Sequence, residues 1–157
     1  MSQSVPPQPG VFPPGPPVPA RPGEGSLALG IVTAVVVALV TAGMYGAIVG
    51  ATQKQIGFVA VGVGLLVGYA AGKAGGSHPV LPLLSALLSV GSVWLGQLIG
   101  TTIGAADLLG VPAAGFFVDH FGILTEAWQR SANPVTFLFL ALGAVAAYSG
   151  TKKAAAA

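Results

Sequence analysis

Asp119 and His120 are the only carboxylate and imidazole that stand side by side in the chain, and together they could bind a metal ion or relay a proton. A structural metal site usually takes four protein ligands and a catalytic one three. The remaining candidates are His78, Asp107 and Glu126. We expect His78 on the opposite side of the membrane, and the spacing from His120 puts Glu126 on a different helix face. The pair is therefore interpreted as a polar edge at the membrane interface, and we assign no catalytic residue, metal or cofactor.

Three serines follow one helical stripe at Ser85, Ser89 and Ser92, and a serine hydrolase would need one of them beside a histidine and an acid. Their spacing places them near a face that also carries Gly96, far from either histidine. Gln97 follows directly, and an amide in lipid must bond to another helix, so we place it in the bundle interior. Cysteine is absent, which removes disulfides, thiolate metal sites and thiol nucleophiles.

The composition indicates the class of protein that carries these residues. Of the 157 residues 54% are hydrophobic and only 6% are charged, whereas an ordinary soluble domain has about 25% charged residues. So few charged side chains cannot cover the surface of a water-soluble fold of this length. The net charge is +2, and no basic stripe with interleaved aromatics points to nucleic acid. The class is integral membrane protein.

Four apolar segments are long enough to cross a bilayer, whose hydrocarbon core of roughly 30 Å takes about 20 helical residues. They cover residues 26–50, 56–72, 80–104 and 134–150. We therefore expect an all-α fold, a four-helix transmembrane bundle within residues 26–153. Ser26 is placed to cap the first helix, and Tyr45 is expected near the far interface, with its hydroxyl in water.

A more polar stretch lies between the third and fourth segments. Apolar side chains recur there at helical spacing, at Phe117, Phe121, Leu124 and Trp128. Asp119, Glu126 and Arg130 occupy the other side, which is the pattern of an amphipathic helix. We expect an interfacial helix over about residues 114–131 with its aromatics in the acyl boundary, weakened at Gly122. A re-entrant course is the alternative.

The two ends of the chain differ from the rest. Most of the 13 prolines fall in residues 1–25. Proline fixes its own φ and donates no hydrogen bond, so this N-terminal tail is expected to be disordered or polyproline II. Its PxxP spacings could dock a partner, or it is a solvated leader, since such spacings arise by chance in proline-dense tails. Residues 154–157 form a short alanine tail.

Glycines recur every fourth residue inside the apolar segments. Positions four apart lie one above another on a helix, and small residues there let two backbones approach closely in lipid. We interpret these ladders as helix-packing faces, at Gly46, Gly50, Gly64, Gly68, Gly72, Gly96, Gly100 and Gly104. Gly62, Gly64 and Gly68 do not indicate a dinucleotide site, because they read GxGxxxG instead of GxGxxG and no strand precedes them.

Basic residues give the orientation. With four spans both chain ends lie on one side of the membrane. That side collects Arg21, Lys73, Lys152 and Lys153, and the opposite side has Lys54 and Arg130. The excess of positive charge predicts cytoplasmic N- and C-termini for a multi-pass protein of the cell's inner (plasma) membrane.

The stretch GAIVGATQKQIGFVAVGVGLLVGYAAGKAGG resembles a group of small, uncharacterised bacterial membrane proteins. Their pattern is a glycine-rich first helix, a short polar turn and a segment of the form IGxxAxGxGxLVG. The likeness covers about residues 43–76 and is weaker through Gly100. Members often carry an acidic residue and a tryptophan around the turn, where this chain has Gln55 and Phe58. The resemblance implies a multi-span fold and no assigned activity.

Three functions are compatible with these features. The first is a non-enzymatic scaffold or accessory subunit that associates with itself or with a larger membrane complex through its glycine faces. The second is a small-solute channel or transporter formed by an oligomer, although no span carries a charged residue at mid-depth, the usual mark of ion-coupled transport. A membrane enzyme that uses the Asp119–His120 region has the least support. The expected partners are the lipid bilayer, a second copy or a larger complex and, if the PxxP spacings are used, a ligand of the proline-rich tail.

Overall fold

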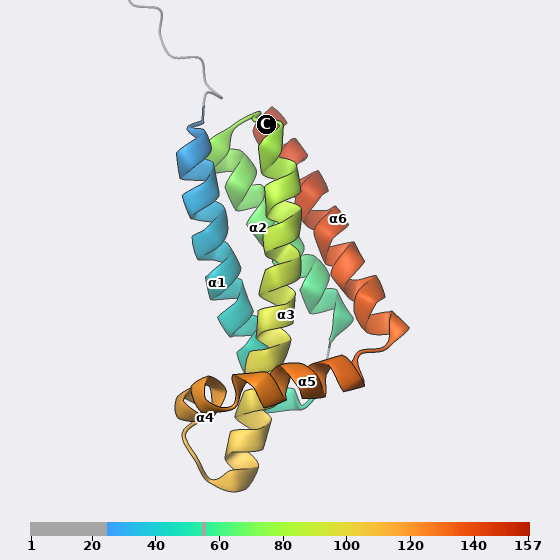
Figure 1. Ribbon diagram of the computed structural model, residues 1–157. Helices are drawn as coiled ribbons and strands as arrows, with labels where there is room; N and C mark the ends of the chain where they lie inside the picture. Colours follow the sequence, from blue (N-terminus) through green and yellow to red (C-terminus); the bar gives the residue numbers. More distant parts are fainter. Residues whose placement is uncertain (1–24, 55) are drawn as a thin grey trace, which may run out of the picture.

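The computed structural model describes residues 25–54 and 56–157, and every regular element there is a helix. The proline-rich segment expected to be disordered lies outside these residues. The helices are α1 (Leu27–Thr52), α2 (Gly57–Gly75), α3 (Val80–Leu109), α4 (Ala113–Asp119), α5 (Phe121–Ser131) and α6 (Pro134–Ala156) (Figure 1). α1, α2, α3 and α6 are long and apolar enough to cross a membrane, so the prediction of an all-α bundle with four spanning helices is confirmed.

The four long helices alternate in direction, so α1 runs parallel to α3, and α2 runs parallel to α6 (Figure 1). The most extensive contacts join these two parallel pairs. α2 and α3 also touch each other, whereas α1 and α6 do not meet along their described lengths. α2 and α3 therefore form the middle of the bundle, and α1 and α6 flank it.

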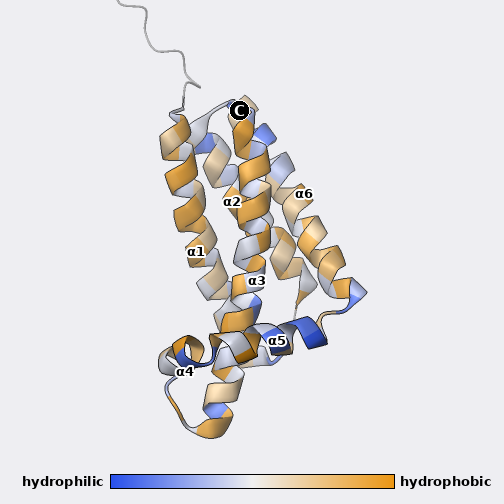
Figure 2. Cartoon of the chain, in the orientation of Figure 1, coloured by the Kyte–Doolittle hydropathy of each residue, from blue (hydrophilic) through white to orange (hydrophobic). Residues whose placement is uncertain are grey.

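Small side chains fill the bundle and large ones cover it. Ala34, Ala60 and Ala71 are fully or almost fully buried, whereas Val32 and Leu39 on α1 are 59% and 61% exposed. Figure 2 shows apolar residues along all four long helices, with hydrophilic ones gathered on α5 and at the helix ends. Such a surface would be one large apolar patch in water. In lipid it faces acyl chains, while close backbone contact holds the helices together.

Several helix ends differ from the sequence expectation. α3 continues past Gly104 to Leu109, because the alanines and leucines beyond that glycine favour a helix and one glycine opposes it by only about 1 kcal/mol. Gly110 then ends it in the left-handed region, with φ 66°. α6 runs on to Ala156 and takes in most of the alanine tail. Ser26 stands at the N-cap of α1, but its side chain makes no capping hydrogen bond.

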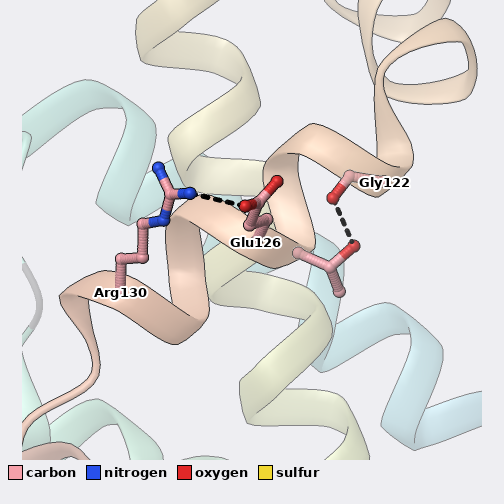
Figure 3. Close-up of polar contacts among 4 residues, drawn as sticks. Gly122, Glu126 and Arg130 are labelled. Carbon is pink, nitrogen blue, oxygen red and sulfur yellow. Dashed lines mark hydrogen bonds and ion pairs between the residues drawn. The ribbon is translucent and has the colours of Figure 1, made fainter.

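The interfacial segment is two helices instead of one. The break falls at His120 (φ −119°, ψ 19°), while Gly122, where we expected weakness, lies inside α5. α5 lies across the long helices near the end of the bundle at which α1 finishes (Figure 1). On its solvent side Arg130 Nη2 lies 2.6 Å from Glu126 Oε1, and the hydroxyl of Thr125 donates to the Gly122 carbonyl (Figure 3). The charged face of α5 thus points away from the bundle.

Candidate functional site

The glycine ladder of α2 lies directly against the backbone of α6. Gly64, Gly68 and Gly72 leave no room for a side chain. A Cβ built on each of them would strike a carbonyl oxygen of α6, at Gly143, Ala147 and Thr151 respectively. Only glycine permits an approach this close, so the α2–α6 seam is a contact of backbone on backbone.

The ladders of α1 and α3 receive side chains instead. A Cβ on Gly46 would lie 2.6 Å from Ile99 Cβ, and one on Gly100 would lie 2.5 Å from Val49 Cβ. Gly50 faces Ile103 in the same way, and Gly96 faces the ring of Tyr45. Each helix therefore offers glycine hollows to large side chains of the other, and the α1–α3 seam is reciprocal.

These contacts occupy the glycine faces within one chain. The remaining ladder position, Gly104, faces the side-chain amide of Gln53, whose Nε2 would lie 2.6 Å from a Cβ built on Gly104. By contrast Gly43, Gly62 and Gly91 have no heavy atom within 4 Å of a built Cβ. Association with a second copy or a larger complex must therefore use a surface other than the ladders.

Gln97 joins α5 to the bundle. It is 3% exposed, and its Oε1 accepts a hydrogen bond of 2.6 Å from the indole Nε1 of Trp128. The ring of Trp94 packs edge-on against Phe121 and Trp128, both with centroids 6.3 Å away. The structure thus places Gln97 in the bundle interior, as the cost of an amide in lipid led us to expect, and its hydrogen-bond partner Trp128 lies on the interfacial helix. Sequence reasoning missed that partner, although Trp94 and Trp128 are the only tryptophans.

A small cavity of about 190 Å³ lies beside this cluster, between α1, α3 and the start of α6. Its polar lining comes from Tyr45, Gln97, Asn133 and Thr136. Tyr45 is only 1% exposed, so the expectation that its hydroxyl reaches water at the interface is wrong. The large side chain is drawn inward because Gly96 of α3 provides the hollow that receives its ring.

Buried hydroxyls run along the inner stripe of α3. Ser85 Oγ lies 2.6 Å from Thr151 Oγ1 of α6, and Ser92 Oγ lies 3.1 Å from Thr41 Oγ1 of α1. Between them Ser89 Oγ is buried and has no hydrogen-bond partner among the described residues. The stripe therefore links α3 to both outer helices by polar contacts in the apolar interior.

Asp119 and His120 are not joined to further ligands. Asp119 is exposed, and the His120 ring stacks on Phe116 with centroids 4.4 Å apart. His78 lies at the opposite end of the bundle, before α3. Within residues 25–54 and 56–157 no group of three His, Cys, Asp or Glu could hold a metal ion. The geometry here is that of a polar helix end.

Charge is divided between the two ends of the bundle. The described carboxylates lie at the end closed by α4 and α5, at Asp107, Asp119 and Glu126. The opposite end carries Lys73, Lys152 and Lys153. Two of these lysines extend over a tyrosine one turn earlier, Lys152 at 5.1 Å from the Tyr148 ring centroid and Lys73 at 6.0 Å from that of Tyr69. Aromatic rings with neighbouring lysines are typical of a membrane–water interface.

The fold thus defines a multi-pass membrane protein built on four apolar helices, two glycine-lined seams and an interfacial helix pair. No family model, curated protein or solved structure matches the chain. The resemblance to small bacterial membrane proteins therefore stays a prediction.

Proposed function

We propose that the protein is a non-enzymatic accessory or scaffold subunit of a larger membrane complex. Its partner would bind the α3–α4 corner, by which we mean residues 107–118. Leu108 at 90% and Val118 at 75% are, together with Phe58 at 84%, the most exposed large apolar side chains among the described residues. This exposure is the observation that carries the proposal.

The length of α3 supports a position of the corner outside the acyl chains. At 1.5 Å per residue, its 30 residues extend about 45 Å, while the hydrocarbon core is roughly 30 Å thick. α2, with 19 residues, extends only about 28 Å. The excess falls at one end, where the tip of α3 projects past α5 (Figure 1). Exposed leucines beyond the lipid tails mark a protein-binding surface.

The charges around the corner indicate what the partner must offer. Asp107 and Asp119 flank the apolar side chains, and the single ion pair among the described residues joins Glu126 to Arg130 instead. A complementary surface has an apolar hollow with lysine or arginine at its rim. The corner is held to the bundle through α5 by the Gln97–Trp128 bond, so it is presented in a fixed position.

Orientation is part of the same proposal. Lys73, Lys152 and Lys153 gather at the end where α6 finishes, which supports a cytoplasmic location for that end in the plasma membrane. α1 begins at the same end (Figure 1). Both termini are then cytoplasmic, and the α3–α4 corner faces the outer side.

The test is site-specific photo-crosslinking in native membranes. A photoreactive residue at position 108 is expected to give one discrete larger adduct, and Asp107→Lys combined with Asp119→Lys should abolish it. The matched control is position 39, where Leu39 is 61% exposed on lipid-facing α1. No adduct at position 108, or the same adducts at position 39, would contradict the proposal. An adduct of twice the chain's mass identifies a second copy as the partner.

The stripe of buried hydroxyls favours a second candidate, a small-solute channel or transporter formed by an oligomer. Ser85, Ser89 and Ser92 connect the region of the small cavity near Gln97 with the opposite end of the bundle. Solute flux in reconstituted vesicles tests this candidate. Flux should fall when Ser89→Leu blocks the stripe and persist in the lipid-facing Leu39→Ala variant, and a protein without flux excludes it.

A further inference from the structure

A second cavity, of about 380 Å³, opens at the lysine-rich end of the bundle. It lies between the turn that precedes α3 and the last turns of α6, so its walls come from two segments far apart in the sequence. The side chains that give it chemical character are Ser77, His78, Pro82, Tyr148, Thr151 and Lys152. Neither the accessory-subunit proposal nor its alternative uses this site.

The polar groups of this cavity suit an anion. The Lys152 ammonium lies 5.1 Å from the Tyr148 ring centroid, so its position over the cavity wall is supported by that ring. His78 adds an imidazole. The hydroxyls of Ser77 and Thr151 also line the cavity, but Ser77 donates to the Ala155 carbonyl, and Thr151 bonds to Ser85 and to the Ala147 carbonyl. Among the described residues that line the cavity there is no carboxylate. An ammonium with a neighbouring imidazole matches the oxygen atoms of a phosphate.

The surface next to the cavity is apolar and faces lipid. Leu83 on α3, one turn beyond Pro79, is 62% exposed, and Val145 on α6, one turn before Tyr148, is 63% exposed. A ligand that fills the cavity and continues along this surface has an anionic head and apolar tails. A free anion would contact only the cavity and not the apolar surface beside it.

We propose that this cavity binds the headgroup of an anionic phospholipid from the leaflet at the lysine-rich end. The phosphate lies beside Lys152 and His78, and the acyl chains run along Leu83 and Val145. Basic pockets between spanning helices are suited to anionic headgroups, since each lysine or arginine near the surface adds attraction. The site would fix α6 to the start of α3 on the side away from the partner-binding corner.

The chain supplies its own controls. Lys153 follows Lys152 directly but does not line the cavity. Lys73 makes the same kind of contact with a tyrosine, at 6.0 Å from the Tyr69 ring, and is also outside the cavity. A general attraction between cations and an anionic bilayer would involve all three lysines alike. Binding in the cavity would depend on Lys152 and on neither of the other two lysines.

The experiment uses the whole chain, purified in a neutral detergent and titrated with phosphatidylglycerol, phosphatidylcholine or inorganic phosphate. Native mass spectrometry counts the bound molecules. We expect one tightly bound phosphatidylglycerol per chain, about fivefold weaker binding in Lys152→Gln, and no comparable change in Lys153→Gln or Lys73→Gln, since one lysine near an anionic headgroup is worth about that factor. His78→Ala should weaken binding by a smaller factor and serves as the second variant if Lys152→Gln does not fold.

Three results would overturn the proposal. Binding of phosphatidylcholine as tight as that of phosphatidylglycerol would contradict a site that selects a net negative headgroup. Loss of binding in Lys153→Gln equal to that in Lys152→Gln would reduce the effect to surface charge. Displacement of phosphatidylglycerol by inorganic phosphate would identify a free-anion site instead of a lipid site. None of these results affects crosslinking at position 108, so the two proposals fail independently.

Discussion

The two seams of the bundle carry the same four-residue glycine spacing and use it in different ways. In the α2–α6 seam, Gly64 and Gly68 lie against carbonyl oxygens of α6. In the α1–α3 seam, Gly50 and Gly100 lie against the side chains of Ile103 and Val49. A backbone atom cannot be removed and moves only with its helix, whereas a side chain can be shortened. One seam is therefore fixed by main-chain geometry, and the other by complementary side-chain size.

The largest effect is expected for Gly68→Ala in the α2–α6 seam. The new methyl group would overlap the Ala147 carbonyl, so the two helices must separate along the seam. Overpacking of this kind destabilises by about 3 kcal/mol at the upper end of the usual range. The exchange Gly68→Ala with Ala147→Gly should not restore stability, because the carbonyl oxygen stays in place. The measurement is SDS-induced unfolding followed by tryptophan fluorescence, and recovery in the exchange variant would show that side chains decide this seam.

A smaller and reversible effect is expected for Gly50→Ala in the α1–α3 seam. All three atoms nearest to its built Cβ belong to the Ile103 side chain, the closest at 2.8 Å. We expect a loss of about 1–2 kcal/mol, because a flexible side chain can yield in part. Ile103→Gly alone should also destabilise, because it removes a packed side chain. Combined with Gly50→Ala it relieves the overlap, so the double variant should lose clearly less stability than the sum of the two single losses. The same unfolding assay applies, and strictly additive losses would contradict the distinction between the seams.

The smallest effect is expected for Gly62→Ala, two residues before the first seam glycine of α2, because a Cβ built on Gly62 has no heavy atom within 4 Å. Its methyl group would enter lipid, and alanine favours the helix over glycine by up to about 1 kcal/mol. Stability should stay the same or rise slightly in the unfolding assay. A loss as large as that of Gly68→Ala would mean that glycine content, and not contact, stabilises α2.

The sequence was sufficient for the spanning segments and for the positions that pack. Hydropathy identifies the four long helices because lipid requires about 20 apolar residues in each. The spacing of Gly64, Gly68 and Gly72 identifies a packing face because it depends only on helix geometry. Neither signal names the partner helix. All four segments carry small residues, so the parallel pairing of α1 with α3 and of α2 with α6 depends on how the whole bundle fits together.

Local helix propensity did not determine where α3 ends, where the interfacial segment breaks or which way the Tyr45 side chain points. Gly104 is only weakly unfavourable in a helix, so α3 continues until Gly110 adopts a positive φ. The interfacial segment breaks at His120, where the backbone leaves the helical region, and not at the glycine two residues later. Tyr45 turns inward to the hollow at Gly96, which exists only once α3 is packed. The cavity near Lys152 could not be predicted from the sequence for the same reason, since its walls meet only in the folded chain.

The central claim is that the glycine-lined seams close within one chain. Because the sequence has no cysteine, one introduced pair of cysteines can test this closure without interference from native thiols. Thr41 Oγ1 and Ser92 Oγ face each other across the α1–α3 seam at 3.1 Å, so Thr41→Cys with Ser92→Cys brings two sulfurs within reach of a disulfide. Mild oxidation in membranes is expected to give a crosslinked monomer on a non-reducing gel. A crosslinked dimer, or two thiols that stay free, would contradict the account.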